Sequence, residues 1–229
     1  MSNREEAPVT ISVQALQRMP YYLHCLRELD SEGLNVVSSP IVASRLGLKE
    51  IQVRKDFAAI STKGGKPKSG FVIHDLIYSM EKFLGYHNVK DAVLVGTGFL
   101  GKALLSFKGF VNYGLKIVAA FDTDPDVIGT MTADKKIFSA DKISDFCRRL
   151  NIHIGIITVP DESAQIVCDQ LVAGGVSAVW NFSQVHLSVP DCILVQNENM
   201  AASLAMLSKH LEEREHGIQN ENKFGDMYI

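Results

Sequence analysis

The chain has 229 residues, which is enough for one large or two modest domains with a real core. The hydrophobic share of 46% and the charged share of 21% are typical of a globular protein, and the sequence has no apolar run long enough to span a membrane. The net charge of −3 combines +2 over residues 1–85 with −5 over the remainder. The N-terminus contains no apolar signal core, so we expect a cytoplasmic protein.

The four cysteines lie far apart and form neither a CxxC pair nor a zinc-ligand spacing with histidine. We therefore expect no metal site. Each cysteine stands in an apolar pattern, which predicts buried, reduced thiols at Cys25, Cys147, Cys168 and Cys192.

The first apolar pattern predicts a helix. Apolar residues recur at helical spacing from about Ser12 to Ser31. Pro20 lies inside this stretch, and proline is tolerated in the first turn of a helix but not in its interior. The sequence therefore favours a helix that starts near Arg18, with residues 12–17 forming a separate turn or short helix.

A helix-turn-helix pattern follows. Residues 38–40, Ser-Ser-Pro, are typical of a helix start, and they predict a short helix over 41–46 that ends at Gly47. A second helix is expected over 49–60 with one apolar face. Two short helices joined by a glycine turn form the motif that places a recognition helix on DNA.

A basic loop comes next. Residues 61–70 contain three lysines and no acid, and they precede a predicted strand over 71–73 and a predicted helix over 74–84. Helix, helix-turn-helix and basic loop, in this order, predict a winged-helix DNA-binding domain over residues 1–85.

The candidate DNA-binding residues lie at the helix start, on the polar face of the recognition helix and in the loop. Arg and Gln side chains can pair with base edges, whereas Lys mostly contacts phosphates. The alternative is a solvated helix face followed by an ordinary loop. The candidates are Ser38, Ser39, Lys49, Gln52, Arg54, Lys55, Lys63, Lys66 and Lys68.

A glycine motif stands between a predicted strand and a predicted helix. In GTGFLG, Gly96 permits a tight turn, Gly98 lets the backbone approach a pyrophosphate, and Gly101 lets the helix pack on the strand. Asp122 ends the next apolar run, where an acid accepts hydrogen bonds from a ribose 2′-hydroxyl and repels a 2′-phosphate. The motif predicts an NAD site. The alternative is a tight turn that binds nothing.

From Val89 onward predicted strands and helices alternate. The strands are expected at 91–95, 116–121, 136–138, 152–158, 177–181 and 192–196, and the helices near 99–107, 139–150, 161–173 and 199–213. This alternation predicts an α/β fold with a Rossmann-type doubly wound parallel sheet. We expect this dinucleotide-binding domain over 86–198, a separate last helix over 199–213 and a flexible tail over 214–229.

The last helix has an apolar stripe at helical spacing, formed by Met200, Leu204, Leu207 and Leu211. Such a stripe at the end of a chain is typical of an interface between subunits, and packing on its own domain is the alternative.

Five segments together resemble the Rex family of redox-sensing transcriptional repressors. The glycine motif is shared with many Rossmann proteins, whereas RKD beside a wing, followed by FDxDP and TVP, is much more specific. The likeness covers roughly residues 12–211. The matching segments are QVRKDF (52–57), GTGFLGKALL (96–105), FDTDPDVIG (121–129), TVP (158–160) and WNF (180–182).

The resemblance implies a homodimer whose C-terminal helix is exchanged between subunits. It implies winged helices that bind an inverted-repeat operator in double-stranded DNA, and release of this DNA when NADH binds. By the same likeness Thr158, Val159, Pro160 and Asn181 lie at the nicotinamide end of the pocket. The expected cofactor-binding residues are Gly96, Thr97, Gly98, Phe99, Leu100, Gly101, Asp122, Thr123, Thr158, Val159, Pro160, Asn181 and Met200.

The chain departs from the family pattern at the switch. Family members usually have Arg where this chain has His24, Tyr where it has Phe107, and Asp-Phe where it has Asn199 and Met200. A permanent Arg–Asp pair is thereby lost, together with a hydroxyl group and a phenyl ring. These replacements predict a weaker or altered redox switch.

Two other functions fit parts of the sequence. A small NAD-dependent dehydrogenase needs an acid or base beside the nicotinamide, for which His153 and His186 are candidates. Both histidines are also typical of ordinary structural positions, and no catalytic residues are assigned. A Rossmann module for another adenine nucleotide, such as coenzyme A, is the second alternative.

Overall fold

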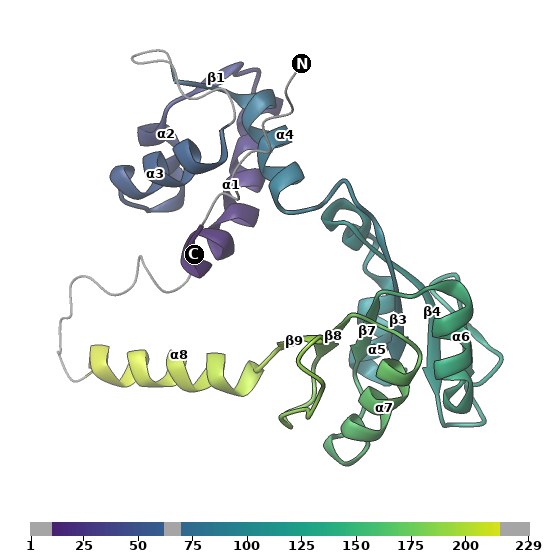
Figure 1. The fold of residues 1–229 in the computed structure, drawn as a ribbon. Helices are drawn as coiled ribbons and strands as arrows, with labels where there is room; N and C mark the ends of the chain where they lie inside the picture. The colour runs from purple at the N-terminus through teal and green to yellow at the C-terminus, as the bar shows by residue number, and fades with distance from the viewer. Residues whose placement is uncertain (1–10, 62–69, 216–229) are drawn as a thin grey trace, which may run out of the picture. The chain divides into compact units, whose positions relative to one another are not determined.

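A computed structural model of the protein describes residues 11–61 and 70–215. These residues fall into two compact units, one ending at Gly85 and the other beginning at Tyr86 (Figure 1), and each unit is described by itself. Within the described ranges, no helix combines the length and the apolar character that crossing a membrane requires.

The first unit is a helical domain with a small two-stranded sheet. The strands pair antiparallel, with Val36 opposite Val72 and Val37 opposite Phe71. The elements are α1 Val13–Ser31, β1 Val36–Val37, α2 Ser39–Leu46, α3 Glu50–Ile60, β2 Phe71–Val72 and α4 Ile73–Phe83.

Helix α1 is continuous from Val13, which corrects the expectation of a helix that starts near Arg18 with Pro20 in its first turn. Pro20 lies in the middle of α1, where a proline removes a backbone hydrogen bond and costs about 3 kcal/mol. Two features offset this cost. Ser12 caps the helix by accepting a hydrogen bond from the Ala15 backbone N–H at 3.2 Å, and Met19 and Tyr22 are fully buried.

The core of the first unit forms beneath α3. Its predicted apolar face is confirmed, because Val53, Phe57 and Ile60 are all buried. The Phe57 ring makes edge-to-face contacts with Tyr22 of α1 and Phe71 of β2. These aromatic contacts hold α3 on the rest of the unit and leave its other face toward solvent.

The second unit is built on a seven-stranded sheet with the order β5-β6-β4-β3-β7-β8-β9. All neighbouring strands pair in parallel, except that β5 pairs antiparallel with β6. Numbered along the chain, the six parallel strands have the spatial order 3-2-1-4-5-6 of a doubly wound dinucleotide-binding sheet. The strands are β3 Lys90–Val95, β4 Leu115–Asp122, β5 Met131–Thr132, β6 Lys135–Ser139, β7 Ile154–Ile157, β8 Ala178–Asn181 and β9 Leu194–Asn197.

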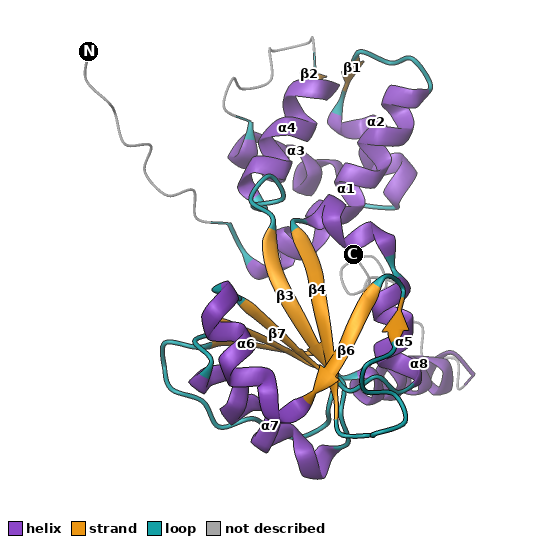
Figure 2. Cartoon of the chain, turned by 90° about the vertical axis from the view of Figure 1, so that its right-hand side faces the viewer, coloured by secondary structure: helices purple, strands orange, loops and turns teal. Residues whose placement is uncertain are grey.

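Helices cover both faces of this sheet (Figure 2). Helices α6 and α7 pack on one face over a core that includes Phe121 and Leu171, and α5 packs on the other face over Leu94 and Ile156. Successive residues of a strand point to opposite faces of the sheet, so each face has its own hydrophobic core. The helices are α5 Phe99–Ser106, η1 Lys108–Tyr113, η2 Ala140–Lys142, α6 Ile143–Leu150, α7 Asp161–Ala173 and α8 Met200–Glu215.

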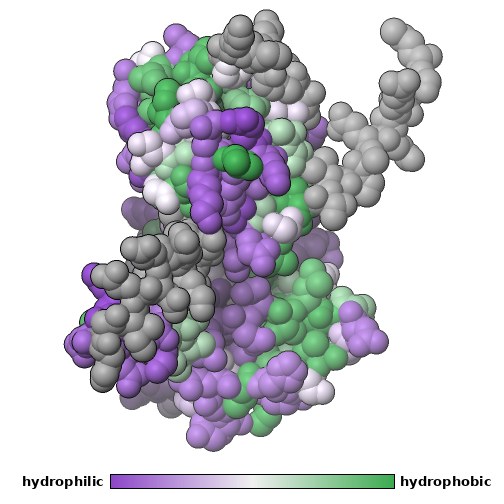
Figure 3. Space-filling view, turned by 90° about the vertical axis from the view of Figure 1, so that its left-hand side faces the viewer, coloured by the Kyte–Doolittle hydropathy of each residue, from purple (hydrophilic) through white to green (hydrophobic). Residues whose placement is uncertain are grey.

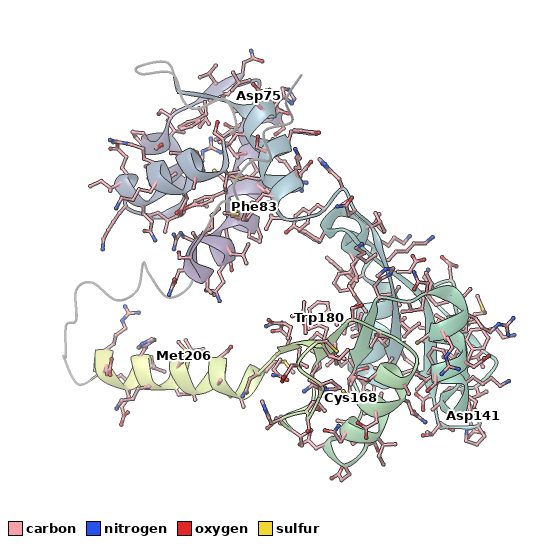
Figure 4. All side chains as sticks on the ribbon, in the orientation of Figure 1. Asp75, Phe83, Asp141, Cys168, Trp180 and Met206 are labelled. Carbon is pink, nitrogen blue, oxygen red and sulfur yellow. The ribbon has the colours of Figure 1, made fainter. Side chains whose placement is uncertain are left out.

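The structure adds or changes several elements. The antiparallel strand β5 and the 3-10 segment η1 were not expected from the sequence. Cys192 is exposed in the turn before the edge strand β9, which corrects the expectation of a buried thiol. Cys25, Cys147 and Cys168 are buried as predicted, and Figure 4 labels Cys168 on α7. Burial raises the pKa of the Cys147 thiol to about 11, so this thiol stays protonated.

Helix α8 has no buried residue. The exposed fraction of each residue in the predicted stripe is between 56% and 67%, for Met200, Leu204, Leu207 and Leu211. Met206, labelled in Figure 4, is 41% exposed. Large apolar side chains also reach the surface elsewhere, as the green areas of Figure 3 show. Helix α8 extends two residues beyond the predicted end, and most of the expected flexible tail lies outside the described residues.

Candidate dinucleotide pocket and nucleic-acid interface

A cavity of about 610 Å³ opens at the carboxyl ends of the central strands. It lies where the strand order reverses, between β3 and β7, and its walls include Gly96 after β3, Asp122 at the end of β4 and Thr158 after β7. Ligands of doubly wound sheets bind at this switch point. Its volume lies within the usual range for cofactor pockets.

The glycine motif has the geometry that its sequence predicts. Gly96 has φ +96°, and a Cβ there would lie 2.7 Å from the carbonyl oxygen of Thr158. A Cβ on Gly101 would overlap the carbonyl oxygen of Gly96. A Cβ on Gly98, by contrast, would meet no atom within 4 Å. The first and third glycines are thus required by the fold, whereas Gly98 faces open space that a ligand can enter.

Thr158 fixes the loop from the opposite side. Its hydroxyl lies 3.0 Å from the carbonyl oxygen of Val95 and 2.7 Å from that of Gly96, and it can donate to either. The loop after β7 therefore holds the glycine turn in place. Helix α5 begins directly after Gly98, so its N-terminal N–H groups and positive dipole end face the cavity.

Asp122 is anchored by four hydrogen bonds. Oδ2 accepts from the Thr97 backbone N–H at 2.7 Å and from the Thr97 hydroxyl at 2.6 Å, and Oδ1 accepts from the N–H groups of Thr123 and Asp124. Burial alone raises the pKa of this carboxyl, but these bonds outweigh burial and lower it below its usual value. Asp122 is therefore ionised at neutral pH. A ribose hydroxyl that donates to Asp122 therefore shares this carboxylate with the N–H and hydroxyl groups of Thr97.

Most of the predicted cofactor residues line the cavity. They are Gly96, Thr97, Gly98, Leu100, Asp122, Thr123, Thr158, Val159 and Pro160. Gly101 lies behind the loop, Phe99 is almost fully exposed outside the cavity wall, and Met200 is exposed on α8.

Asn181 is completely buried. Its amide nitrogen donates to the carbonyl oxygen of Val185 at 3.1 Å and to Asn197 Oδ1 at 2.9 Å, and its amide oxygen accepts from Ser183. This side chain ties the ends of β8 and β9 to the next loop. The adjacent Phe182 lines the cavity instead.

The wall residues that the sequence did not indicate include Lys102, Asp124, Ser163 and Phe182. Two of these positions had a readable signal. Lys102 lies in the first turn after the glycine motif, and Ser163 lies in the first turn of α7, so both are at helix N-termini that follow parallel strands. Phe182 had no such signal, because its place depends on the neighbouring strand.

A series of aromatic side chains in contact connects the cavity with the residues just before α8. Phe182 contacts Trp180, labelled in Figure 4, which contacts Phe110, and Phe110 contacts Phe107. The Trp180 indole N–H donates to Glu198 Oε1 at 2.9 Å, two residues before α8 begins. The only tryptophan of the chain thus lies between the pocket and this helix.

Most of the predicted DNA-binding residues on and beside the recognition helix α3 reach solvent. Lys49 and Lys55 are exposed, Gln52 is half-buried, and Arg54 forms an ion pair with Glu50 one turn away. Ser38 is the N-cap residue of α2, and the Ser39 side chain is buried inside the unit. Lys63, Lys66 and Lys68 lie outside the described residues.

Comparison with known proteins covers both units. Residues 10–58 match the family model of a putative DNA-binding protein N-terminus, and residues 87–185 match that of a CoA binding domain. The redox-sensing transcriptional repressor Rex of Treponema denticola is 37% identical over 204 residues, which are 89% of this chain and 95% of the relative. The chain belongs to the Rex family.

Other Rex proteins show the same extent of similarity. The Rex repressor of Bacteroides fragilis is 38% identical, covering 87% of this chain and 90% of the relative. The structure of RSP, a Rex-family repressor, in complex with β-NAD⁺ and operator DNA has a TM-score of 0.83 at 28% identity, over 93% of this chain and 99% of that chain. The structure of RSP with β-NADH has a TM-score of 0.79. The predicted fold class is confirmed.

The positions where the chain departs from the Rex pattern have local partners. His24 is largely exposed and lies 3.3 Å from Glu28 on the same helix. Asn199 caps α8, because its Oδ1 accepts from the Ala202 backbone N–H at 2.9 Å. Phe107 is half-exposed against Phe110.

Neither candidate catalytic histidine lines the cavity. The His153 backbone N–H bonds to the carbonyl oxygen of Asp91 beside the sheet, at the opposite end of the strands from the glycine loop. Among the described residues, no three His, Cys, Asp or Glu side chains lie close enough together to hold a metal ion.

Proposed function

We propose that this member of the Rex family represses transcription by binding an inverted-repeat DNA operator as a homodimer. NAD(H) bound in the second unit sets its DNA affinity, so that repression responds to the NADH/NAD⁺ ratio. One observation supports this above all: a single chain combines an exposed recognition helix with a dinucleotide cavity at the switch point of its sheet. The related RSP has been solved with β-NAD⁺ and operator DNA, and with β-NADH.

The cavity residues fit a dinucleotide. The open face of Gly98 admits a pyrophosphate to the N-terminus of α5, where N–H groups and the helix dipole favour negative charge. The ionised Asp122 faces the ribose of the adenosine half and repels a 2′-phosphate. Val159, Pro160 and Phe182 supply apolar contacts at the other side. This arrangement favours NAD(H) over NADP(H).

We propose no enzymatic reaction for this protein. A dehydrogenase needs an acid or base beside the nicotinamide, and neither His153 nor His186 is a wall residue of the cavity. The named relatives are repressors. We propose a cytoplasmic location, because a repressor acts where the chromosome is.

Helix α8 provides the surface for the homodimer. Its exposed stripe of Met200, Leu204, Leu207 and Leu211 is more apolar than a helix in solvent normally is. Pairing of two chains buries this stripe, and in an exchanged arrangement α8 brings Asn199 and Met200 near the partner. The same helix is joined to Trp180 through Glu198, so the pocket and the dimer contact are linked.

Asp122→Ala is expected to weaken NADH binding tenfold or more. The substitution removes a charged acceptor of ribose hydroxyls and also frees the Thr97 turn that the carboxylate holds. Quenching of Trp180 fluorescence by NADH measures the affinity. Asp126→Ala is the matched control, because Asp126 is exposed on the same loop but does not line the cavity. Equal affinity of both variants would place the dinucleotide elsewhere.

Lys55→Ala is expected to weaken binding to all DNA duplexes about equally and to lower the salt dependence of affinity by about one counterion. Lys55 is exposed on the recognition helix. The control is Lys82→Ala, which removes an exposed lysine from α4. Mobility shifts over a range of salt concentrations, with duplexes selected from a random pool, test this. A chain that retains no duplex at low salt is not a repressor.

NADH and NAD⁺ are expected to change DNA affinity by less than a hundredfold relative to each other. A ligand shifts an equilibrium only by its differential affinity for the two states, and His24 and Asn199 replace the family's permanent ion pair. DNA affinity at saturating NADH, at saturating NAD⁺ and without cofactor measures this difference. Combining His24→Arg with Asn199→Asp is expected to enlarge it. A hundredfold loss with NADH in the unaltered protein would contradict the expectation.

A further inference from the structure

A buried charge cluster lies beneath the recognition helix. Arg18 of α1 and Asp56 of α3 are 4% and 8% exposed, and Tyr22 is fully buried. Arg18 Nε and Nη2 donate to Asp56 Oδ2 at 3.0 and 2.8 Å, and the Tyr22 hydroxyl donates to the same oxygen at 2.8 Å. Three donors on one carboxylate oxygen hold the guanidinium in a fixed position.

The guanidinium also contacts Gln52. This residue precedes Asp56 by one helical turn, so both side chains lie on the same face of α3. Guanidinium nitrogens only donate hydrogen bonds, so the part of the Gln52 amide that faces Arg18 has to be its oxygen. In this orientation the amide oxygen accepts from Arg18 Nη1 at 2.8 Å and from Nη2 at 3.3 Å.

The fixed orientation restricts what Gln52 can recognise. An unrestrained Gln pairs with adenine through two bonds, in which its oxygen accepts from N6 and its nitrogen donates to N7. Here Arg18 donates to the amide oxygen, and Gln52 lines an open cavity of about 960 Å³. Gln52 is therefore left as a donor alone. Major-groove acceptors without an adjacent donor are found on guanine, at O6 and N7, and on thymine, at O4. Adenine N7 also accepts, but the N6 amino group beside it then lacks its acceptor, because Arg18 already holds the amide oxygen.

We propose that Arg18 is a positioning residue that makes Gln52 a donor-only contact, so that Gln52 selects guanine or thymine, and rejects adenine and cytosine, at one base pair of each DNA half-site. The inference rests on the proposed DNA-binding function. Residues in the N-terminal half of a recognition helix are those that contact base edges, and Gln52 is the third residue of α3.

The first experiment finds the base pair and its preferred base. Duplexes selected from a random pool by the full chain are compared with those selected by Gln52→Met, which keeps the side-chain length but has no amide. We expect one position per half-site to lose its preference in the variant. At this position the unaltered protein is expected to bind guanine or thymine at least about fivefold more tightly than adenine or cytosine. A preference for adenine or cytosine there, or no position that depends on Gln52, overturns the proposal.

The second experiment removes the hydrogen bonds from Arg18 to the Gln52 amide oxygen. Arg18→Met, Tyr22→Phe and Asp56→Leu together replace the cluster by apolar side chains of similar size, a kind of change that folded proteins often tolerate. The combined variant is expected to accept adenine as well as guanine at the same position, with an unchanged salt dependence of binding. Tyr22→Phe alone is the matched control and is expected to keep the original preference, because Arg18 and Asp56 remain paired.

The outcomes separate this inference from the proposed function. If the combined variant folds and keeps the full discrimination against adenine, Arg18 does not position Gln52. If it does not fold, the comparison of the unaltered protein with Gln52→Met still decides between donor-only and two-bond recognition. If the unaltered protein binds no duplex, the proposed function fails and this inference fails with it.

Discussion

Gly101→Ala is expected to abolish measurable binding of NADH and to destabilise the second unit by about 3 kcal/mol. A methyl group at this position overlaps the carbonyl oxygen of Gly96, which is backbone and has no side-chain freedom to move aside. The glycine turn and the N-terminus of α5 then have to separate. The pyrophosphate site is lost because it consists of these two elements. Titration with NADH and thermal unfolding followed by circular dichroism measure the two effects.

Gly98→Ala distinguishes a loss of NADH binding from a loss of folding stability. A Cβ at Gly98 meets no protein atom within 4 Å, and its φ of −64° is open to any residue. This variant is expected to unfold like the unaltered protein and still to bind NADH at least tenfold more weakly, because the methyl group occupies the space in which a pyrophosphate approaches the backbone. If Gly101→Ala binds NADH normally, the glycine loop is not the phosphate site.

Asp56→Ala is expected to destabilise the first unit by about 3–5 kcal/mol. The substitution leaves the Arg18 guanidinium buried without its carboxylate and deprives the Tyr22 hydroxyl of its acceptor. Removing one partner of a buried pair is more harmful than replacing both, because the remaining charge has no water around it. Faster amide hydrogen exchange in α1 and α3, with unchanged exchange in the second unit, is the expected observation.

Tyr22→Phe is the control for this change. It removes one hydroxyl and retains both the ion pair and the ring contact with Phe57, so a loss of only about 1 kcal/mol is expected. If Asp56→Ala and Tyr22→Phe exchange their amides at the same rate, the ion pair does not stabilise α3 on α1.

The amino-acid sequence by itself determined the features that depend on neighbours in the chain. The spacing of Gly96, Gly98 and Gly101 follows from the shape of one turn, and the position of Asp122 follows from the length of one helix and one strand. The alternation of strands and helices indicated the doubly wound sheet, and the apolar face of α3 indicated the core of the first unit. All these patterns are local, so they can be recognised before the chain is folded.

Only the tertiary structure decided the features that depend on residues far apart in the chain. Pro20 stays inside α1 because Met19 and Tyr22 are packed against other elements, which a local helix rule does not include. Asn181 is a buried connection because β9 lies beside β8. The contact between Arg18 and Gln52 joins two helices. A hydrogen bond of this kind needs both partners at about 3 Å, and only packing of the hydrophobic core brings them to that distance.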